Sequence, residues 1–241
     1  MFISEDVIPI TYTIAPYNVQ DATYILYCNH VIFPAGTIHI AWVDIFCVQN
    51  TNLLVATYNG HYFILPDNGI FSYIFDMDNL KILHCEPINR EADETERLRQ
   101  VAGLCAKIRG EGWNSTMAYD LYKIPRYTIS NMVKTATSYS FGVLHISKRG
   151  NVIVDLKQTM FENMGLSSGY EILVPGKKNI TEISPNCFLA SDLVPVAFFN
   201  EFGFLELAKY KSSVAFLLGI IDSSPSNLAG QKITIQKKQL A

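Results

Sequence analysis

Two polar positions at the ends of apolar segments are the best candidates for chemistry in this sequence. Asp67 and Asn68 follow the apolar run 61–66 and precede Gly69, and Asp44 lies near the end of the run 37–46. Open α/β sheets bind ligands at the carboxyl ends of their strands, so two adjacent strand ends would form a polar crevice here. Asp, Asn and Gly also accept the backbone angles of tight turns, and this simpler interpretation stays open.

Other signatures of catalysis or metal binding do not occur in the sequence. The five histidines are scattered without metal-ligand spacing, and no G-x-S-x-G, P-loop or G-x-G-x-x-G motif occurs. His39 and His61 lie inside strand patterns, where we expect core or face residues and no ligands. We therefore expect no metal and no cofactor. In the second half, the turns at 149–151 and Asn200 can offer amide groups to a ligand.

The first 130 residues alternate between strand and helix patterns. Asn59-Gly60 separates two apolar strands and is typical of a type I′ hairpin. The apolar spacing in the remaining segments predicts strands at 7–14, 37–46 and 81–88, and helices at 19–32, at 69–76 and within 90–112. We expect an α/β domain over 1–130, with a mostly parallel sheet and flanking helices.

The pattern changes near residue 138 to short strands separated by turns. A hairpin is expected at 140–156, and further strands at 170–174, 192–200, 204–208 and 232–236, with one short helix at 212–220. Such a succession favours a small antiparallel barrel or sandwich. The second domain is therefore expected to be a β-barrel over 138–241.

Composition limits the possible classes of protein. Hydrophobic residues make up 49% of the 241 residues, and the net charge of −3 provides no basic surface for nucleic acid. No apolar run is long enough to span a membrane, and Glu5 and Asp6 occupy a region where a signal peptide needs basic residues. Five cysteines without a C-x-x-C motif indicate reduced thiols. We expect a cytoplasmic protein without nucleic-acid or membrane partners.

Several segments together resemble one known family. "FPAGTIHIAWVD" and "GHYFILPDNGIFSYIF" in the first half, and "VLHISKRGNVIVDL" and "FFNEFGFLELA" in the second, are similar in order and content to motifs of the S-adenosyl-methionine (SAM) hydroxide adenosyltransferases. These enzymes are relatives of the nucleophilic fluorinase and chlorinase. The resemblance covers nearly the whole chain.

The resemblance implies a fold, an assembly and a reaction. It implies an α/β domain followed by a β-barrel, a homotrimer, and SAM bound between the first domain of one subunit and the second domain of the next. Water-derived hydroxide or a halide attacks the ribose C5′, and methionine leaves. Asp44 matches a catalytic Asp of the family, Asn151 and Asn200 match family asparagines, and Asp67-Asn68 belongs to the PDNG turn that borders the pocket.

This chain also departs from the family pattern at several charged positions. The opening T-D-F-G segment is not found, so we expect the first strand and helix of the family to be missing. The family's water-activating Arg and His would fall near Thr51 and Asp93. Ser147 stands where an aspartate holds the methionine ammonium, and Glu201 and Phe202 stand where a pair of residues holds its carboxylate.

These departures leave two functional hypotheses. The chain is a SAM hydrolase with impaired or altered activity, which binds the adenosyl compound through Asp67, Asn68, Asn151 and Asn200 and activates water with Asp44. Alternatively it is a non-catalytic paralogue that binds an adenosyl ligand or has a structural role.

Overall fold

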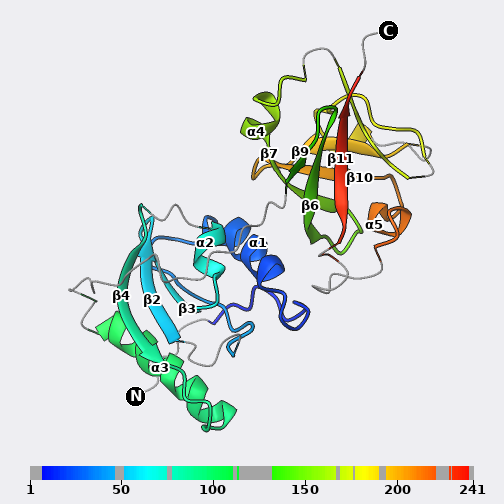
Figure 1. Cartoon of the computed structure of the whole chain (residues 1–241). Coiled ribbons are helices and arrows are strands. Elements are labelled where there is room, and N and C mark those ends of the chain that lie inside the picture. Colours follow the sequence, from blue (N-terminus) through cyan, green and yellow to red (C-terminus); the bar gives the residue numbers. More distant parts are fainter. Residues whose placement is uncertain are drawn as a thin grey trace. The chain divides into compact units, whose positions relative to one another are not determined.

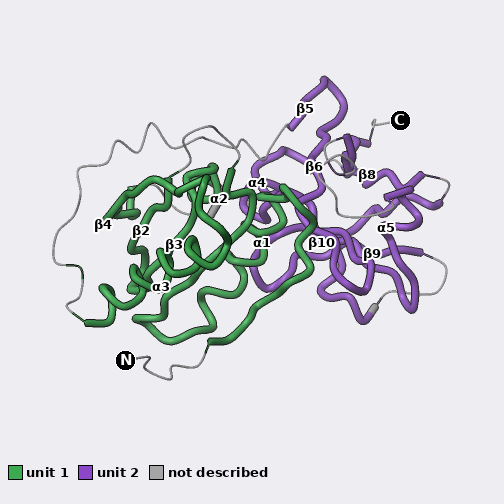
Figure 2. Tube along the Cα trace, turned by 90° about the horizontal axis from the view of Figure 1, so that it is seen from below, with its two compact units in different colours: residues 1–126 green, residues 127–241 purple. Residues whose placement is uncertain are grey.

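The chain forms two compact units, residues 1–126 and 127–241, drawn as a cartoon in Figure 1 and in two colours in Figure 2. The structure is a computed structural model. It describes residues 7–46, 52–74, 78–110, 113, 132–166, 169–175, 177–189, 194–220, 228 and 230–238. No helix among these residues is long and apolar enough to cross a membrane.

The first unit contains a four-stranded sheet with helices on both faces. Its strands are β1 (Ile38–Ile40), β2 (Asn52–Tyr58), β3 (His61–Pro66) and β4 (Lys81–Pro87), in the order β1-β3-β2-β4. Its helices are α1 (Val19–His30), α2 (Ile70–Ile74) and α3 (Glu94–Gly110). The helices and strands of the α/β prediction are therefore largely confirmed, although residues 7–14, which include Pro9, form no strand.

The prediction of a mostly parallel sheet is wrong, because the sheet is mixed. β1 pairs with β3 in parallel, whereas β2 is antiparallel to both β3 and β4. The reason lies in the predicted hairpin: Asn59 and Gly60 have φ values of 48° and 79°, which suit the tight turn between β2 and β3. A two-residue turn reverses the chain, so the strands that it joins are antiparallel.

Alternate residues of the central strands pack on opposite faces of this sheet. Leu54, Ala56 and Phe63 pack with α1 and α2 on one face. Leu53, Val55 and Ile64 pack with α3 on the other face. This alternation follows from the two-residue period of a strand, and it produces the three layers of helix, sheet and helix seen in Figure 1.

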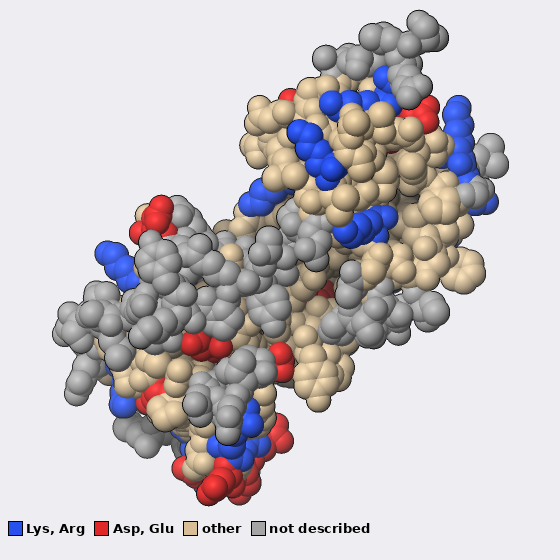
Figure 3. Space-filling view, in the orientation of Figure 1, with Lys and Arg blue, Asp and Glu red and all other residues tan. Residues whose placement is uncertain are grey.

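Helix α3 has one apolar face and one charged face. Val101, Leu104 and Ile108 are buried against the sheet, while acidic residues lie in the first turn and basic residues in the last turn. This charge order is favourable for the helix dipole. Figure 3 shows acidic and basic side chains gathered on the part of the first unit where α3 lies.

The second unit is a curled antiparallel sheet. Its strands are β5 (Val133–Lys134), β6 (Ser138–Ile146), β7 (Val152–Lys157), β8 (Tyr170–Ile172), β9 (Val196–Phe199), β10 (Phe204–Ala208) and β11 (Lys232–Lys237). They follow the order β8-β11-β6-β7-β10-β9, with β5 paired to β6. The short helices are α4 (Gln158–Glu162), η2 (Cys187–Leu189) and α5 (Val214–Leu217).

The curled sheet encloses the larger apolar core of the second unit. Phe141, Val154 and Leu205 are among its fully buried members. Single bridges join Ile172 to Ile180 and Ile183 to Ala197, so the segment 180–183 connects edge strand β8 with edge strand β9. The structure thus contains the antiparallel curvature expected of the second domain, in the form of a half-barrel.

Three histidines from different elements meet inside the first unit. His30 of α1, His39 of β1 and His61 of β3 are each at most 7% exposed, and His39 Nε2 lies 3.2 Å from His61 Nδ1. His39 and His61 are core residues, as expected from their strand patterns. Burial lowers the pKa of His39 to about 4, assisted by His61 and His30, and burial also lowers the pKa of His61.

The histidine cluster predicts that the first unit loses stability in acid. The unfolded chain protonates His39 near pH 6.5 and the folded chain only near 4, so stability is complete above pH 6.5 and falls as the pH approaches 4. Between pH 7 and pH 5 the loss attributable to His39 is roughly 2 kcal/mol. Urea unfolding followed by tryptophan fluorescence measures it, because both tryptophans, Trp42 and Trp113, belong to the first unit.

The matched variant is His39→Leu, which removes the titrating group from the same buried position. Its unfolding free energy should depend less on pH over this interval. An unchanged pH dependence in His39→Leu would contradict the assignment.

Candidate functional site

The carboxyl ends of three strands meet at one edge of the first sheet. β1 is parallel to β3, and both β3 and β4 are antiparallel to β2, so β1, β3 and β4 all end on the same side. The amide of Asp67 confirms this arrangement by donating to the carbonyl of Asn52, where β2 begins, at 2.8 Å. Ligands of open α/β sheets bind at such an edge.

Asn68 connects the segment after β3 to the segment after β1. Its side-chain Nδ2 donates to the carbonyl of Val43 at 2.8 Å and to that of Asp44 at 3.3 Å. Its Oδ1 accepts from the amide of Ile70 at 3.2 Å, at the start of α2. The sequence prediction that the two strand ends lie side by side is thus confirmed for Asp44 and Asn68. The side-chain amide of Asn68 bonds to backbone groups, so its role in the structure is to position this edge.

Asp44 is held in an unusual backbone conformation. Its φ of 47° lies in the left-handed region, which Asp tolerates better than most residues because its short polar side chain can bond locally. Burial raises the pKa of its carboxyl group, and no cation among the described residues contributes to that shift. A desolvated carboxylate without a neighbouring cation is a stronger base than a solvated one.

Asp67 is the most deeply placed carboxyl group at this edge, with 8% of its surface exposed. Burial raises the pKa of the nearby Cys85 thiol, and the charges of Asp67 and Glu86 raise it further. A thiol held protonated in this way is a poor nucleophile. The carboxylates of Asp67 and Glu86 therefore define the local electrostatics of the edge, and Cys85 is not its reactive group.

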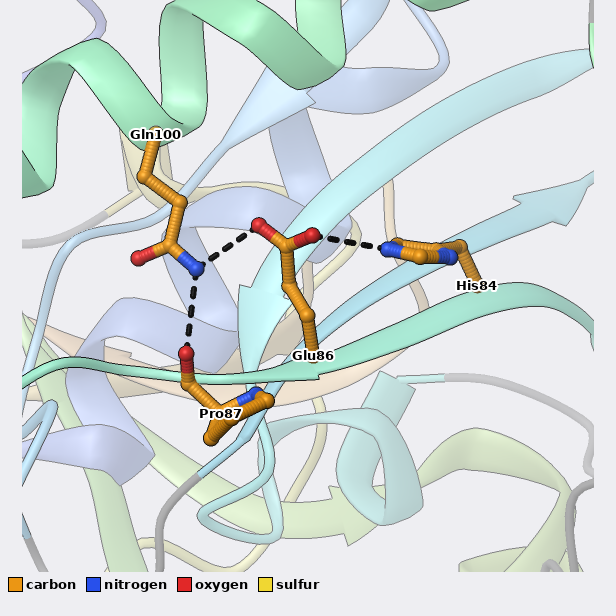
Figure 4. Close-up of polar contacts among 4 residues, drawn as sticks. All are labelled: His84, Glu86, Pro87 and Gln100. Atoms are coloured by element: carbon orange, nitrogen blue, oxygen red, sulfur yellow. Dashed lines mark hydrogen bonds and ion pairs between the residues drawn. The ribbon is translucent and has the colours of Figure 1, made fainter.

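A histidine, a carboxylate and an amide form a chain at the end of β4 that the sequence analysis did not identify. His84 Nε2 lies 2.8 Å from Glu86 Oε2, and Gln100 of α3 donates to Glu86 Oε1 at 2.7 Å and to the Pro87 carbonyl at 3.0 Å (Figure 4). The ring of Trp113 lies 5.0 Å from that of His84. The signal for this pair was the H-x-E spacing on a strand, which places both side chains on one face.

The orientation of this histidine has a chemical consequence. Because a carboxylate only accepts hydrogen bonds, His84 Nε2 is the donor to Glu86, and Nδ1 is the acceptor of the ring in its neutral form. A base held by an orienting carboxylate is one part of a nucleophilic site. The structure places this part at the same sheet edge as Asp67.

The family resemblance places a water-activating Arg and His near Thr51 and Asp93, and neither of these residues is an Arg or a His. Asp93 precedes α3, and its Oδ1 accepts from the amide of Glu96 at 2.8 Å, so it caps the helix. Thr51 lies outside the described residues. The described part of the edge therefore presents Asp44 without these two partners.

In the second unit, the two predicted asparagines converge on a glutamate. Asn151 Nδ2 donates to Glu206 Oε1 at 2.8 Å, and Asn200 Nδ2 lies 3.2 Å from Glu206 Oε2. Asn200 Oδ1 also accepts from the amides of Phe202 and Phe204, each at 3.1 Å. Asn151 and Asn200 are thus brought together, and Glu206 is the polar residue that the sequence analysis missed.

The turn before Asn151 is closed by Ser147. The Ser147 amide donates to the carbonyl of Asn151 at 2.9 Å, and its hydroxyl accepts from the Asn151 amide at 3.1 Å. A serine at this position stabilises the hairpin but supplies no negative charge. Among the residues that the structure describes, no group of His, Cys, Asp and Glu has an arrangement that could hold a metal ion.

The fold and the polar groups define a class of protein: a helix–sheet–helix unit with a strand-end site, followed by a curled antiparallel unit with a polar network between β7 and β10. A family model described as the SAM hydroxide adenosyltransferase N-terminal domain matches residues 3–107. A protein of Methanocaldococcus jannaschii named (R)-S-adenosyl-L-methionine hydrolase is 22% identical over 229 residues, which are 89% of this chain and 79% of that protein. The first unit is therefore similar to the N-terminal domain of the SAM hydroxide adenosyltransferases, and most of the chain is similar to a SAM hydrolase.

Solved structures have the same fold. An uncharacterized conserved protein from Thermotoga maritima matches with a TM-score of 0.70 and 18% identity, over 97% of this chain and 89% of that one. A conserved hypothetical protein from Thermus thermophilus matches with a TM-score of 0.61 and 19% identity, over 94% and 85% of the two chains. The chain resembles the SAM hydrolase over most of its length, and the likeness to the solved structures extends across both units.

The hydrogen bonds of Glu206 to Asn151 and Asn200 predict that replacing Glu206 destabilises two turns at once. Glu206→Ala leaves the amide groups of Asn151 and Asn200 without their shared acceptor, so the turns 147–151 and 200–203 should open more often. The expected increase in amide hydrogen exchange is about 10-fold or more, because losing a hydrogen bond to a charged group costs about 1.5–3 kcal/mol. The control Glu201→Ala removes an exposed carboxylate from the same turn and should change exchange little. An effect confined to one turn would contradict the network.

Proposed function

We propose that this chain is a SAM hydrolase of reduced activity, which releases adenosine and methionine. The observation that carries the proposal is the family match over the segment that contains Asp44 and the Asp67-Asn68 turn. The likeness to a protein named SAM hydrolase over 89% of the chain supports it. No cofactor is part of the proposal, and SAM is the substrate.

The proposed reaction is a displacement at carbon. Water attacks the ribose C5′, a C–O bond forms, and the C–S bond breaks with its electron pair passing to sulfur. Methionine leaves as a neutral thioether, so the leaving group needs no acid. One proton is lost from the attacking water, and Asp44 is the base that accepts it before releasing it to solvent.

The features of Asp44 suit this role. Its raised pKa makes its carboxylate a stronger base, and Asn68 fixes the backbone on which it is carried. The reduced activity follows from the residues at Thr51 and Asp93, which do not supply the Arg and His of the family pattern. In this proposal Asn151 and Asn200 contribute to ligand binding from the turns that Glu206 joins.

The proposal predicts slow but measurable formation of adenosine from SAM by the purified chain. Asp44→Asn should reduce the rate by about 100-fold or more, since a general base contributes about 10²–10⁴-fold. The rate should fall as the pH drops through the raised pKa of Asp44, because only the ionised carboxylate accepts a proton. Chromatography of adenosine and methionine provides the measurement, with the exposed Asp78→Asn as the control.

Two results would contradict the proposal. Saturable binding of SAM without any adenosine would identify a non-catalytic adenosyl-binding paralogue. Equal rates for Asp44→Asn and the unaltered chain would remove Asp44 from the mechanism.

We also propose that the chain acts as a cytoplasmic homotrimer. The polar groups assigned to the ligand fall in both units, and the family pattern assembles its site from the first domain of one subunit and the second domain of the next. The thiols of Cys85 and Cys187, which form no disulfide among the described residues, support a reducing location.

Light scattering after size-exclusion chromatography tests the assembly. A trimer has a mass of three times 27.1 kDa, and it should persist at micromolar protein because the shared site needs more than one copy. The mass of a single chain at that concentration would refute the trimer without bearing on the chemistry of Asp44.

A further inference from the structure

The two outer strands of the first sheet, β1 and β4, differ in how their outer edges are protected. β4 begins at Lys81, ends at Pro87 and pairs with β2 through an irregular register. Charged residues, proline and irregular pairing are among the usual means by which an edge strand avoids further pairing. β1 has none of these three, because it consists of Ile-His-Ile and no charged residue occurs in 31–43. Its outer edge is therefore open to a further strand.

The backbone groups on this edge follow from the pairing of β1 with β3. The amide of Tyr62 donates to the carbonyl of Thr37 at 3.0 Å, and the amide of Ala41 donates to β3 at 3.4 Å, so the pairing extends beyond the three residues of β1. Successive residues of a strand direct their backbone groups to opposite sides, so those of Ile38 and Ile40 point away from β3. No strand among the described residues pairs with that outer side.

An apolar segment in the same unit has the pattern of a strand but pairs with none. Every second residue of 7–14 from Ile8 onward is apolar, and threonines or Pro9 lie between. This alternation is typical of a strand with one apolar face. The segment forms no strand in the structure, and Ile8 and Tyr12 are 62% and 88% exposed. The amides of Ile10 and Tyr12 have no hydrogen-bond partner among the described residues.

We propose that the segment 7–14 of one copy of this chain adds a strand to the β1 edge of a second copy. Within one copy the segment and the edge belong to the same unit, yet they do not pair. The edge therefore remains available to the segment of another copy. Each copy gives one segment and accepts one, so the exchange closes in a dimer or in a cyclic trimer. The inference is independent of SAM hydrolysis and holds whether or not the chain performs it.

Pro9 determines which side of the segment faces β1. It has no amide hydrogen, so within a sheet that side of the strand lies toward solvent. The backbone groups of Ile10 and Tyr12 then face β1. Those of Thr11 and Thr13 face outward, where the Thr13 amide already donates to Thr11 Oγ1 at 3.1 Å.

The exposed surface is large enough for a specific contact between copies. Val7, Ile8 and Tyr12 are 90%, 62% and 88% exposed. Large side chains each bury roughly 150 Å², so three from each of two copies, with the surface that they cover, exceed about 1,000 Å², the size at which specific interfaces begin. Neither the segment nor residues 31–43 carry a charge, so no like charges oppose the contact.

Photocrosslinking from position 12 tests the proposal in the full chain. With benzoylphenylalanine in place of Tyr12, light should join two chains into a product of twice 27.1 kDa on a denaturing gel. Mass spectrometry should place the attachment within residues 37–43 of the second chain. The matched control is benzoylphenylalanine in place of Tyr17, which is also exposed, at 74%, but lies outside the segment. The control should give no attachment within 37–43.

Three results would overturn the exchange. A crosslink from position 12 to 37–43 in a product with the mass of one chain would show that the segment pairs with its own β1. Attachment to another part of the second chain would place the segment elsewhere. Absence of a joined product would show that copies do not meet through this segment.

Proline substitutions in the chain that carries the crosslinker test the predicted side of the segment. Ile10→Pro removes an amide that should bond to β1, so the yield of joined chains should fall about 10-fold or more. Thr11→Pro removes an amide that should face outward, so the yield should stay within about twofold. Ile10→Val keeps the amide and a β-branched side chain, and should also keep the yield. Equal losses in the two proline variants would contradict the assignment.

Discussion

The hydrogen bonds of the Asn68 side-chain amide are the interaction on which the strand-end site depends. They join the segment after β3 to the backbone of Val43 and Asp44, while Oδ1 holds the start of α2. One buried side chain thereby satisfies three backbone groups in different segments. Since unsatisfied buried polar groups cost about 1–3 kcal/mol each, this edge is a preformed structure before any ligand arrives.

The question raised by the Asp67-Asn68-Gly69 turn has a two-part answer. Asn68 and Gly69 shape the turn, and Gly69 has a φ of 91°. Asp67 contributes a buried carboxyl group whose charge reaches Cys85. The turn geometry and the buried charge are thus supplied by adjacent residues, and the Asn68 side chain joins them to the backbone of Asp44.

Local patterns were sufficient to predict most helices and strands. The spacing of Val19, Ala22 and Leu26 predicted α1, and Asn59-Gly60 predicted the β2–β3 hairpin. The parallel sheet was wrong because alternation of helix and strand patterns does not fix the direction of each pairing. The two-residue turn sets that direction, because strands joined by such a turn must be antiparallel. This constraint outweighs the general preference of α/β proteins for parallel strands.

Contacts between distant residues could not be predicted in the same way. Glu206 lies 55 residues from Asn151, and His39 lies 22 residues from His61. Neither pair has a local periodic signal, because each depends on strand order and register. His84 and Glu86 differ in this respect, since two residues apart on a strand they necessarily share a face.

The polar network around Glu206 explains how asparagines matched to a ligand site can serve the fold. A carboxylate accepts from both amides, so the two turns of the β7–β10 region are fixed with respect to each other. An Asn side-chain amide has two N–H donors, and the contact with Glu206 uses one of them. Structural and binding roles are therefore compatible in Asn151 and Asn200.

The close contact between Gly150 and Ser213 has a consequence for how this protein can change over generations. A side chain at position 150 needs a backbone displacement at 213 at the same time, and each change alone is unfavourable. The spacing between the β6–β7 turn and the segment before α5 therefore depends on both residues together. Because the Ala215 amide also donates to the Gly150 carbonyl, a substitution at position 150 would disturb the start of α5 as well as the β6–β7 turn.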